Sequence, residues 1–417
     1  MTDRMRPPVD LHQVLDLRVG EVVHGGWCVA RLADESNFVV FVRHALPGER
    51  VRAVVTQLTA KFARADAVEI SESAPERVRP PCPQARPGGC GGCDWQHASL
   101  AAQREFKAAV ISQQLRRIAG IEREVTVRPL TGESVGLQWR TRVRFAVGAD
   151  GQAGLHKHRS AEIVPVGDCL IAHPLVTQAE VTRRSWPGAR SVEVAVAPGS
   201  GQRAVLADHD RRAGSQPQTL TQHAAGRDWQ VAATGFWQVH PAAADTLAAA
   251  VLDGLGPKPG ETALDLFCGA GLFAGVLADA VGPDGTVIGV EQDQIAVRDA
   301  RHNLRPTPWA RVHRGDAADV IGRIGLFGAS IAVLDPPRAG VGQPLVDALC
   351  LAGTGALDPG SGPGLRRIAY VSCDPATLAR DLASFARHGW QLTELLAFDA
   401  FPMTHHVECL ALIEPAG

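Results

Sequence analysis

Hydrophobic and polar positions alternate along short segments of residues 12–72, and the pairs Gly25-Gly26 and Pro47-Gly48 interrupt them. Alternation with a period of two is typical of strands that bury one face, and such glycine and proline pairs mark turns between strands. Residues 12–72 are therefore predicted to form a small β-barrel that resembles the OB fold.

The pattern changes twice more along the chain. Residues 99–118 keep apolar positions at helical spacing, and residues 125–235 return to short strand segments. After residue 235, apolar strands alternate with helices, which predicts an α/β fold around a mainly parallel sheet. The predicted domains are a barrel at 12–72, a β-rich central domain at 73–235 and a doubly wound α/β domain at 236–417.

An acid or a thiol lies at the end of each predicted parallel strand of the third domain. These residues are Asp265, Glu291, Asp316, Asp335 and Cys373. Parallel strands end at one edge of the sheet, and doubly wound sheets bind their ligands at that edge. The glycine turn at 267–271 suits a nucleoside-bearing cofactor, and Glu291 suits hydrogen bonds to ribose hydroxyls. We expect a cofactor site there.

Cys373 lies between a buried strand, 368–371, and a helix start at Asp374-Pro375. A helix N-terminus favours negative charge and lowers the pKa of a thiol, which predicts a nucleophile. Asp374 adds a negative charge that opposes ionisation, so we expect Cys373 to be activated when substrate closes the site. The alternative interpretation is a buried structural thiol.

Glu408 interrupts an otherwise apolar strand at 407–413. A carboxylate that enters a buried region needs a partner or a chemical task. Glu408 is therefore a candidate general base, and the alternative is a solvent-exposed residue at a strand edge.

Three cysteines, Cys82, Cys90 and Cys93, lie within twelve residues of a glycine-rich segment. Cys169 is the next cysteine along the chain and the candidate fourth ligand. Four thiolates suit either a structural zinc ion or an iron-sulfur cluster. Three local ligands with one distant ligand favour the cluster.

Composition and charge predict the partners and the compartment of the protein. The formal net charge is -2, but residues 101–144 hold nine Lys or Arg and four Glu. This basic segment and Trp139-Arg140 could meet a nucleic acid, or could be an ordinary solvated surface. We find neither a signal peptide nor an apolar run that could cross a bilayer, which predicts a cytoplasmic protein, expected to be a monomer, without a membrane partner.

Several motifs together resemble the S-adenosylmethionine-dependent RNA uracil-C5 methyltransferases. They are Phe-x-Gln-Val at 236–239, Asp-Leu-Phe-Cys-Gly at 265–269, Asp-Pro-Pro-Arg at 335–338, Ser-Cys-x-Pro-Ala-Thr-Leu-Ala-Arg-Asp at 372–381 and His-Val-Glu at 406–408. Residues 26–31 and 40–51 resemble a TRAM domain, an RNA-binding barrel. The resemblance implies a class I Rossmann-like methyltransferase domain, with the TRAM barrel before it and an iron-sulfur domain between them.

The resemblance also implies roles for single residues. Cys373 would be the nucleophile and Glu408 the base, and Gln238, Phe267, Glu291 and Asp335 would contact S-adenosyl-L-methionine. Cys82, Cys90, Cys93 and Cys169 would hold a 4Fe-4S cluster with a structural or RNA-binding role.

The sequence departs from the family pattern at three positions. Leu272 stands where relatives often have a small polar residue, and Asp299 and Asp374 stand where asparagine is common. Of the possible substrates, 23S ribosomal RNA is favoured because TRAM and cluster elements are typical of the ribosomal enzymes of the family. The alternatives are a transfer RNA methyltransferase and a non-catalytic RNA-binding or assembly protein that retains the fold.

Overall fold

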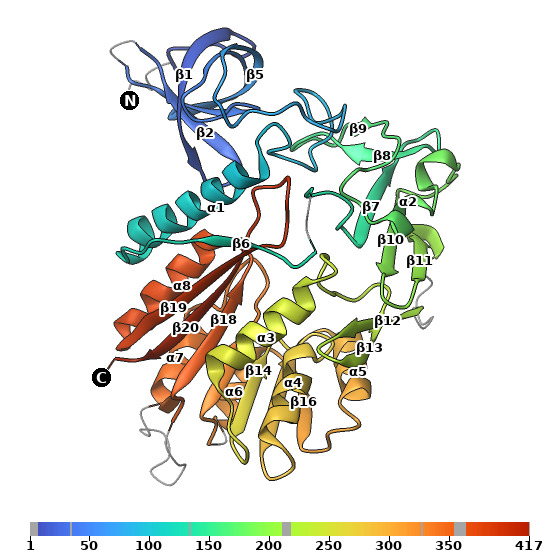
Figure 1. Cartoon of the computed structure of the whole chain (residues 1–417), viewed down its shortest axis with the longest axis vertical. Coiled ribbons are helices and arrows are strands. Elements are labelled where there is room, and N and C mark those ends of the chain that lie inside the picture. The colour runs from blue at the N-terminus through green and yellow to red at the C-terminus, as the bar shows by residue number, and fades with distance from the viewer. Residues whose placement is uncertain are drawn as a thin grey trace, which may run out of the picture.

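The computed structural model describes residues 7–33, 36–132, 135–210, 218–326, 328–353 and 364–416 (Figure 1). A β-barrel occupies one end of the molecule and a large α/β sheet occupies the other, and a smaller sheet lies to one side of both. Among the described residues, no helix is long and apolar enough to cross a membrane.

The barrel is closed by five strands in the order β1-β2-β3-β5-β4. Its interior consists of small and β-branched residues such as Val40, Val51 and Ala63, which are fully buried and occupy alternate positions, as the sequence pattern predicts. The strands are β1 Val14–Val23, β2 Trp27–Arg31, β3 Val39–Arg43, β4 Arg50–Leu58 and β5 Phe62–Glu72. The predicted N-terminal barrel is confirmed.

Helix α1, Leu100–Gln114, joins the barrel to the large sheet. It begins at Ser99, whose hydroxyl accepts a hydrogen bond from the Ala102 N–H, and a π-helical turn, Leu115–Ala119, continues it. Val110 packs into the barrel core, whereas Ile111 belongs to the core of the large sheet. The two cores are therefore connected through one helix.

The central part of the chain forms a five-stranded sheet in the order β11-β10-β7-β8-β9 and a separate two-stranded hairpin, β12-β13. The hairpin packs on the large sheet's helices, since Trp229 and Val231 share their core. The elements are β7 Arg142–Val147, β8 Ala153–His156, β9 Ile163–Val164, α2 Pro174–Thr177, β10 Ser191–Ala197, β11 Gln202–Ala207, β12 Thr219–Ala224 and β13 Arg227–Ala232.

The large sheet has eight strands in the order β16-β15-β14-β17-β18-β20-β19-β6. Strands β14 to β18 are parallel, and β20 is antiparallel to both of its neighbours. The strands are β6 Val127–Pro129, β14 Thr262–Leu266, β15 Thr286–Glu291, β16 Ala310–Arg314, β17 Ile331–Leu334, β18 Arg367–Ser372, β19 Trp390–Asp399 and β20 Glu408–Pro415. Its helices are α3 Ala243–Leu255, α4 Leu272–Val281, α5 Gln294–Asn303, α6 Ala317–Ile324, α7 Gln343–Gly353 and α8 Pro375–Arg387.

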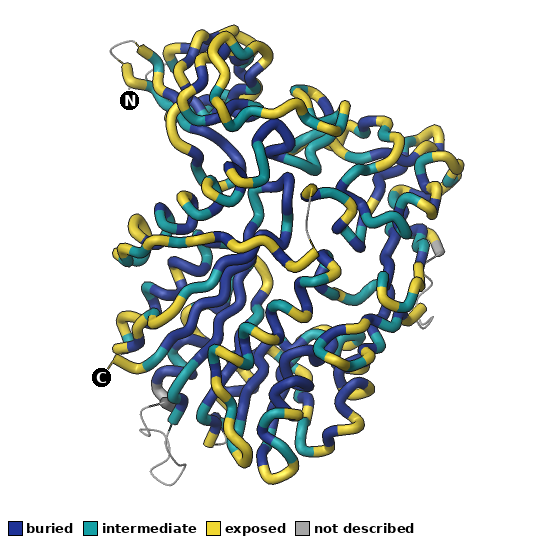
Figure 2. The backbone as a smooth tube through the Cα atoms, viewed as in Figure 1, coloured by how far each residue is buried: buried dark blue, intermediate teal, exposed yellow. Residues whose placement is uncertain are grey.

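Helices cover both faces of this sheet, so its central strands are buried along most of their length (Figure 2). One face packs on α3, α4 and α5, and the other packs on α1, α6, α7 and α8. The predicted α/β fold is therefore confirmed. β14 lies between β15 and β17, so the chain reverses direction across the sheet there, and such a switch point opens a crevice for ligands.

Three side chains of the basic segment and its neighbourhood have structural roles. Lys107 belongs to the basic segment, but its side chain is fully buried and pairs with Asp399. Trp139 is buried beside Ile171 and Met403, and Arg142 pairs with Glu193. These residues hold the fold together and are not an open RNA surface.

Candidate active site

A cavity of about 1100 Å³ opens at the carboxyl edge of the parallel strands. This volume can hold a nucleoside-sized cosubstrate and a nucleobase together. All six predicted catalytic and cofactor-binding residues line it, namely Gln238, Phe267, Glu291, Asp335, Cys373 and Glu408.

The turn after β14 shapes one half of the cavity. Phe267, Gly269 and Gly271 all have positive φ, of 72°, 52° and 95°, so the backbone curls tightly before α4. Glu291 supports this turn, because its Oε2 accepts a hydrogen bond from the Gly269 N–H at 2.9 Å. Its Oε1 accepts from the Asp293 N–H at 2.8 Å. Both oxygens are thus held by backbone donors in a fixed orientation.

Asp265 differs from the expectation for it. It lies inside β14 and is fully buried, and its Oδ2 accepts a hydrogen bond from the Ala274 N–H at 2.6 Å. Burial raises the pKa of this carboxyl well above its usual range. Asp265 therefore fixes the first turn of α4 from its position inside β14, and it does not line the cavity.

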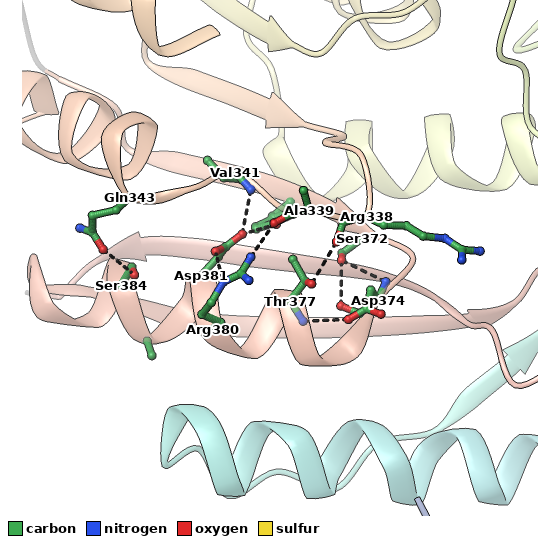
Figure 3. Close-up of polar contacts among 12 residues, drawn as sticks. Arg338, Ala339, Val341, Gln343, Ser372, Asp374, Thr377, Arg380, Asp381 and Ser384 are labelled. Atoms are coloured by element: carbon green, nitrogen blue, oxygen red, sulfur yellow. Dashed lines mark hydrogen bonds and ion pairs between the residues drawn. The ribbon is translucent and has the colours of Figure 1, made fainter. Parts of the chain in front are cut away.

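Cys373 follows β18 directly, at the other half of the cavity. Figure 3 shows Asp374 between Ser372 and Thr377, where its Oδ1 accepts from the Thr377 N–H at 2.8 Å and caps α8. Because Ser372 pairs with Cys409 in the neighbouring strand, Glu408 lies at the same level as Cys373. The predicted nucleophile and base thus come from adjacent strands.

The position of Cys373 at a helix N-terminus does not lower the pKa of its thiol. Burial and the nearby Glu408 carboxylate raise the pKa of this thiol to about 11, although Arg338 opposes the rise. Desolvation and like charge outweigh the helix N-terminus here. The thiol is therefore protonated at neutral pH, as expected if substrate binding activates it.

Two buried carboxyl groups face the thiol. Burial and the charge of Asp335 raise the pKa of Glu408 well above its usual range, although Arg338 lowers it. Burial raises the pKa of Asp335 to about 7. Arg338 is therefore the counter-charge for both Cys373 and Glu408, a role that sequence reasoning missed although Asp-Pro-Pro-Arg contains the residue.

Helix α8 fixes the loop that carries Arg338 (Figure 3). The Thr377 hydroxyl donates to the Arg338 carbonyl at 3.1 Å, and Arg380 donates to the Ala339 carbonyl at 2.6 Å. The Val341 N–H donates to Asp381 Oδ2 at 2.8 Å. The helix that begins beside Cys373 therefore also sets the position of the 338–341 loop.

Gly340 is the tightest point of this loop. Its φ is 87°, and a β-carbon there would overlap Asp381 and Thr377. We expect Gly340→Ala to lower the free energy of unfolding by about 3 kcal/mol, from backbone strain and steric overlap together. Gly342→Ala is the matched control, because Gly342 has a φ of 78° but a β-carbon there would make only an ordinary contact, 3.9 Å from Pro344, and about 1 kcal/mol is expected. Urea unfolding measures the free energy of unfolding of both variants. Equal losses would contradict the close approach of Gly340 to Asp381 and Thr377.

The loop between β19 and β20 carries two histidines, His405 and His406. His405 donates from its backbone N–H to Asp94 Oδ2 at 3.1 Å, and its ring nitrogen Nδ1 lies 2.6 Å from the same oxygen. His406 lies 3.2 Å from Arg338. The buried Lys107 anchors the loop start by donating to the Phe401 carbonyl at 3.0 Å. Both histidines line the cavity.

The four cysteines of the predicted cluster lie outside the cavity but near one another. Burial raises the pKa values of Cys90, Cys93 and Cys169, and nearby cysteines among the four raise each of them further. The Gly92 N–H donates to Cys90 Sγ at 3.3 Å. Within the described part of the chain, however, no group of three or more His, Cys, Asp or Glu side chains could hold a metal ion. The donor chemistry fits a cluster, but the arrangement does not confirm one.

Two of the three departures from the family pattern lie at the cofactor side of the cavity, and the third, Asp374, caps α8 beside Cys373. Leu272 begins α4 and lines the cavity with an apolar side chain. Asp299 also lines it, and its Oδ2 accepts from the Ala232 N–H at 2.7 Å. Asp299 therefore ties the β12-β13 hairpin to α5.

Comparison with protein families matches three parts of the chain. Residues 9–68 match the TRAM domain, residues 257–319 match a methyltransferase domain, and residues 323–415 match the tRNA (uracil-5-)-methyltransferase family. A solved structure, Pyrococcus abyssi tRNA (uracil-54, C5)-methyltransferase with S-adenosyl-L-homocysteine, has a TM-score of 0.70 and 21% identity. It covers 96% of this chain and 100% of that chain, so the two share their whole fold.

Curated relatives extend over the same length. An RNA methyltransferase of Streptomyces avermitilis is 45% identical, over 96% of this chain and 98% of its own. The 23S rRNA (uracil(1939)-C(5))-methyltransferase RlmD of a Shewanella species is 31% identical over 93% of each chain. With its barrel, its sheet and its cavity, the chain belongs to the family of S-adenosylmethionine-dependent RNA (uracil-C5) methyltransferases.

Proposed function

We propose that this enzyme methylates carbon 5 of a uridine through a covalent adduct on Cys373, with Glu408 as the base that completes the reaction. The observation that carries this proposal is the placement of Cys373 and Glu408 on adjacent strands in one cavity. Carbon 5 of uracil is too weak a nucleophile to take a methyl group unaided, and a reversible covalent bond solves this problem.

The proposed reaction has three steps. When substrate closes the site, the Cys373 thiol loses its proton to water and the thiolate adds to carbon 6 of the base, and the electron pair of the carbon 5–carbon 6 double bond moves into an enolate. Carbon 5 then attacks the methyl group of S-adenosylmethionine, and S-adenosylhomocysteine leaves. Glu408 removes the proton from carbon 5, and the electrons restore the double bond and expel the thiolate.

The cofactor half of the cavity is the proposed site for S-adenosylmethionine. We propose that Glu291 binds its ribose hydroxyls, because backbone donors fix the carboxylate at the strand end. Phe267 and Gln238 would contact the rest of the molecule. The segment that carries Gln238 is fixed as well, since the Thr141 N–H and hydroxyl donate to the carbonyl of the next residue, Val239, at 2.8 Å and 3.0 Å. Asp335 lies between the two halves and would contact both cofactor and uracil.

We propose 23S ribosomal RNA as the substrate. The Shewanella relative, similar over nearly its whole length, is named for that RNA, whereas the Pyrococcus protein with the same fold is named for transfer RNA. The target uridine would leave its stacked position and enter the cavity, while the barrel grips the RNA around it.

Nucleoside mass spectrometry of fractionated RNA from a deletion strain tests this substrate. We expect the 5-methyluridine content of 23S ribosomal RNA to decrease in the deletion strain, and to be restored when the intact gene is supplied. Loss from the transfer RNA fraction would support the alternative substrate, and no loss from either fraction would contradict the proposal.

We propose that Cys82, Cys90, Cys93 and Cys169 hold a 4Fe-4S cluster, because four neighbouring thiols with a backbone donor suit it. Protein purified without oxygen is expected to contain iron and acid-labile sulfide, and Cys93→Ser is expected to lose both. Cys350→Ala, a change in α7, is the control that should keep them. Zinc without sulfide would identify a zinc site instead, and the absence of any metal would refute the proposal.

A further inference from the structure

The turn between β1 and β2 brings the barrel into direct contact with the loop that carries Cys373 and Asp374, which we call the catalytic loop. His24 Nε2 lies 3.1 Å from Asp374 Oδ2, although the two residues are 350 positions apart. The ring of His24 also meets the ring of His405 edge-on, with centroids 6.4 Å apart. One barrel side chain therefore contacts the residue next to Cys373.

The turn is shaped for this close approach. Gly25 and Gly26 have φ values of 91° and 80°, which favour glycine. A β-carbon on Gly26 would lie 3.0 Å from the Asp94 side chain, which holds His405. The barrel, the segment that carries Cys90, Cys93 and Asp94, and the catalytic loop thus meet near His24.

The contact changes the charge beside the nucleophile. Burial would raise the pKa of Asp374, but its hydrogen bond with His24 and the capped helix hold that pKa well below its usual range. Because the carboxylate is ionised and can only accept, His24 must carry a proton on Nε2. The main charges that act on Cys373 come from Glu408, Arg338, Asp335 and Asp374, and of these only Arg338 is positive.

We propose that His24 is a positioning residue of the methyl transfer, which offsets the negative charge of Asp374 and so allows the Cys373 thiolate to form. The proposal rests on the proposed function of Cys373. It makes the RNA-binding barrel a part of the catalytic apparatus, because displacement of the barrel would remove the hydrogen bond. The side chains of His24 and Asp374 are 37% and 24% exposed, so solvent screens the effect and a modest change is expected.

The test measures alkylation of Cys373 by iodoacetamide in the full-length enzyme, by peptide mass spectrometry between pH 7 and 9. We expect His24→Ala to slow alkylation roughly threefold, since about half a unit of thiol pKa is a threefold change in thiolate. Asp374→Asn removes the charge and can still cap α8, so it should not slow alkylation. The double variant should react like Asp374→Asn. Single-turnover methylation is expected to follow the same order.

A purely structural role for His24 predicts a different result. If His24 only docks the barrel, the double variant stays as slow as His24→Ala, and that outcome overturns the proposal. Wild-type reactivity of His24→Ala overturns it as well. If His24→Ala does not fold, His24→Leu also removes the hydrogen-bond donor but keeps a larger side chain, and it is judged against Asp374→Asn by the same criterion. The proposed function fails separately, if Cys373→Ala still forms an RNA adduct, because alkylation does not require RNA.

Discussion

Cys373→Ala is expected to abolish methyl transfer, with a loss of more than about 10⁴-fold in the rate of the chemical step. Without the thiol no adduct forms at carbon 6, and carbon 5 stays too weak a nucleophile for the methyl group. S-adenosylmethionine binding should be unchanged, because Glu291 and the turn after β14 belong to the opposite half of the cavity. Single-turnover assays and isothermal calorimetry measure the two effects separately.

RNA that carries 5-fluorouridine gives the direct readout. Fluorine cannot leave carbon 5 as a proton does, so the enzyme and RNA remain joined and the complex survives denaturation. Cys268→Ala is the matched control, because Cys268 is the other cysteine among the cavity-lining residues. We expect the complex with Cys268→Ala and none with Cys373→Ala. The reverse result would move the nucleophile to Cys268.

The sequence predicted correctly which residues line the cavity where short local motifs determine their positions. Glu291, Asp335 and Cys373 follow from predicted strand ends, because parallel strands end at a common edge of the sheet. Gln238 and Phe267 came from the resemblance to the family. Asp265 was placed one position too near this edge, because a pattern locates the end of a strand only approximately. The burial of Glu408 in an apolar strand was also visible as a conflict between residue type and surroundings.

Contacts between distant segments could not be predicted. Lys107 and Asp399 are 292 positions apart, and Asp94 and His405 are 311 apart. Such pairs form only when separate domains pack together, and no periodicity records them. The main causes of the raised pKa of Cys373 could not be predicted for the same reason. Its local setting is a helix start, but the larger effects are burial and the charge of Glu408, which arrives on another strand.

Glu408→Gln is expected to stop the reaction after methyl transfer and before release. Glutamine has the same shape but cannot accept the carbon 5 proton, so the methylated RNA stays bound to Cys373. A general base contributes typically 10²–10⁴-fold, and we expect release to slow about a thousandfold. With methyl-labelled S-adenosylmethionine and unmodified uridine, the label should appear in a protein–RNA complex that survives denaturation. Glu414→Gln, on the same strand but paired with Arg367, is the control that should release its product normally.

The pH dependence of release separates Glu408 from its neighbour. An acceptor works only when it is deprotonated, so raised pKa values place the active form at higher pH, and release should slow as the pH falls. Asp335, with a pKa of about 7, would give the same trend if it were the base. Asp335→Asn therefore decides between them. Trapping of methylated RNA by Asp335→Asn, with normal release by Glu408→Gln, would assign the proton to Asp335. The expected result is the opposite, because Glu408 lies level with the Cys373 thiol across the β18–β20 pair.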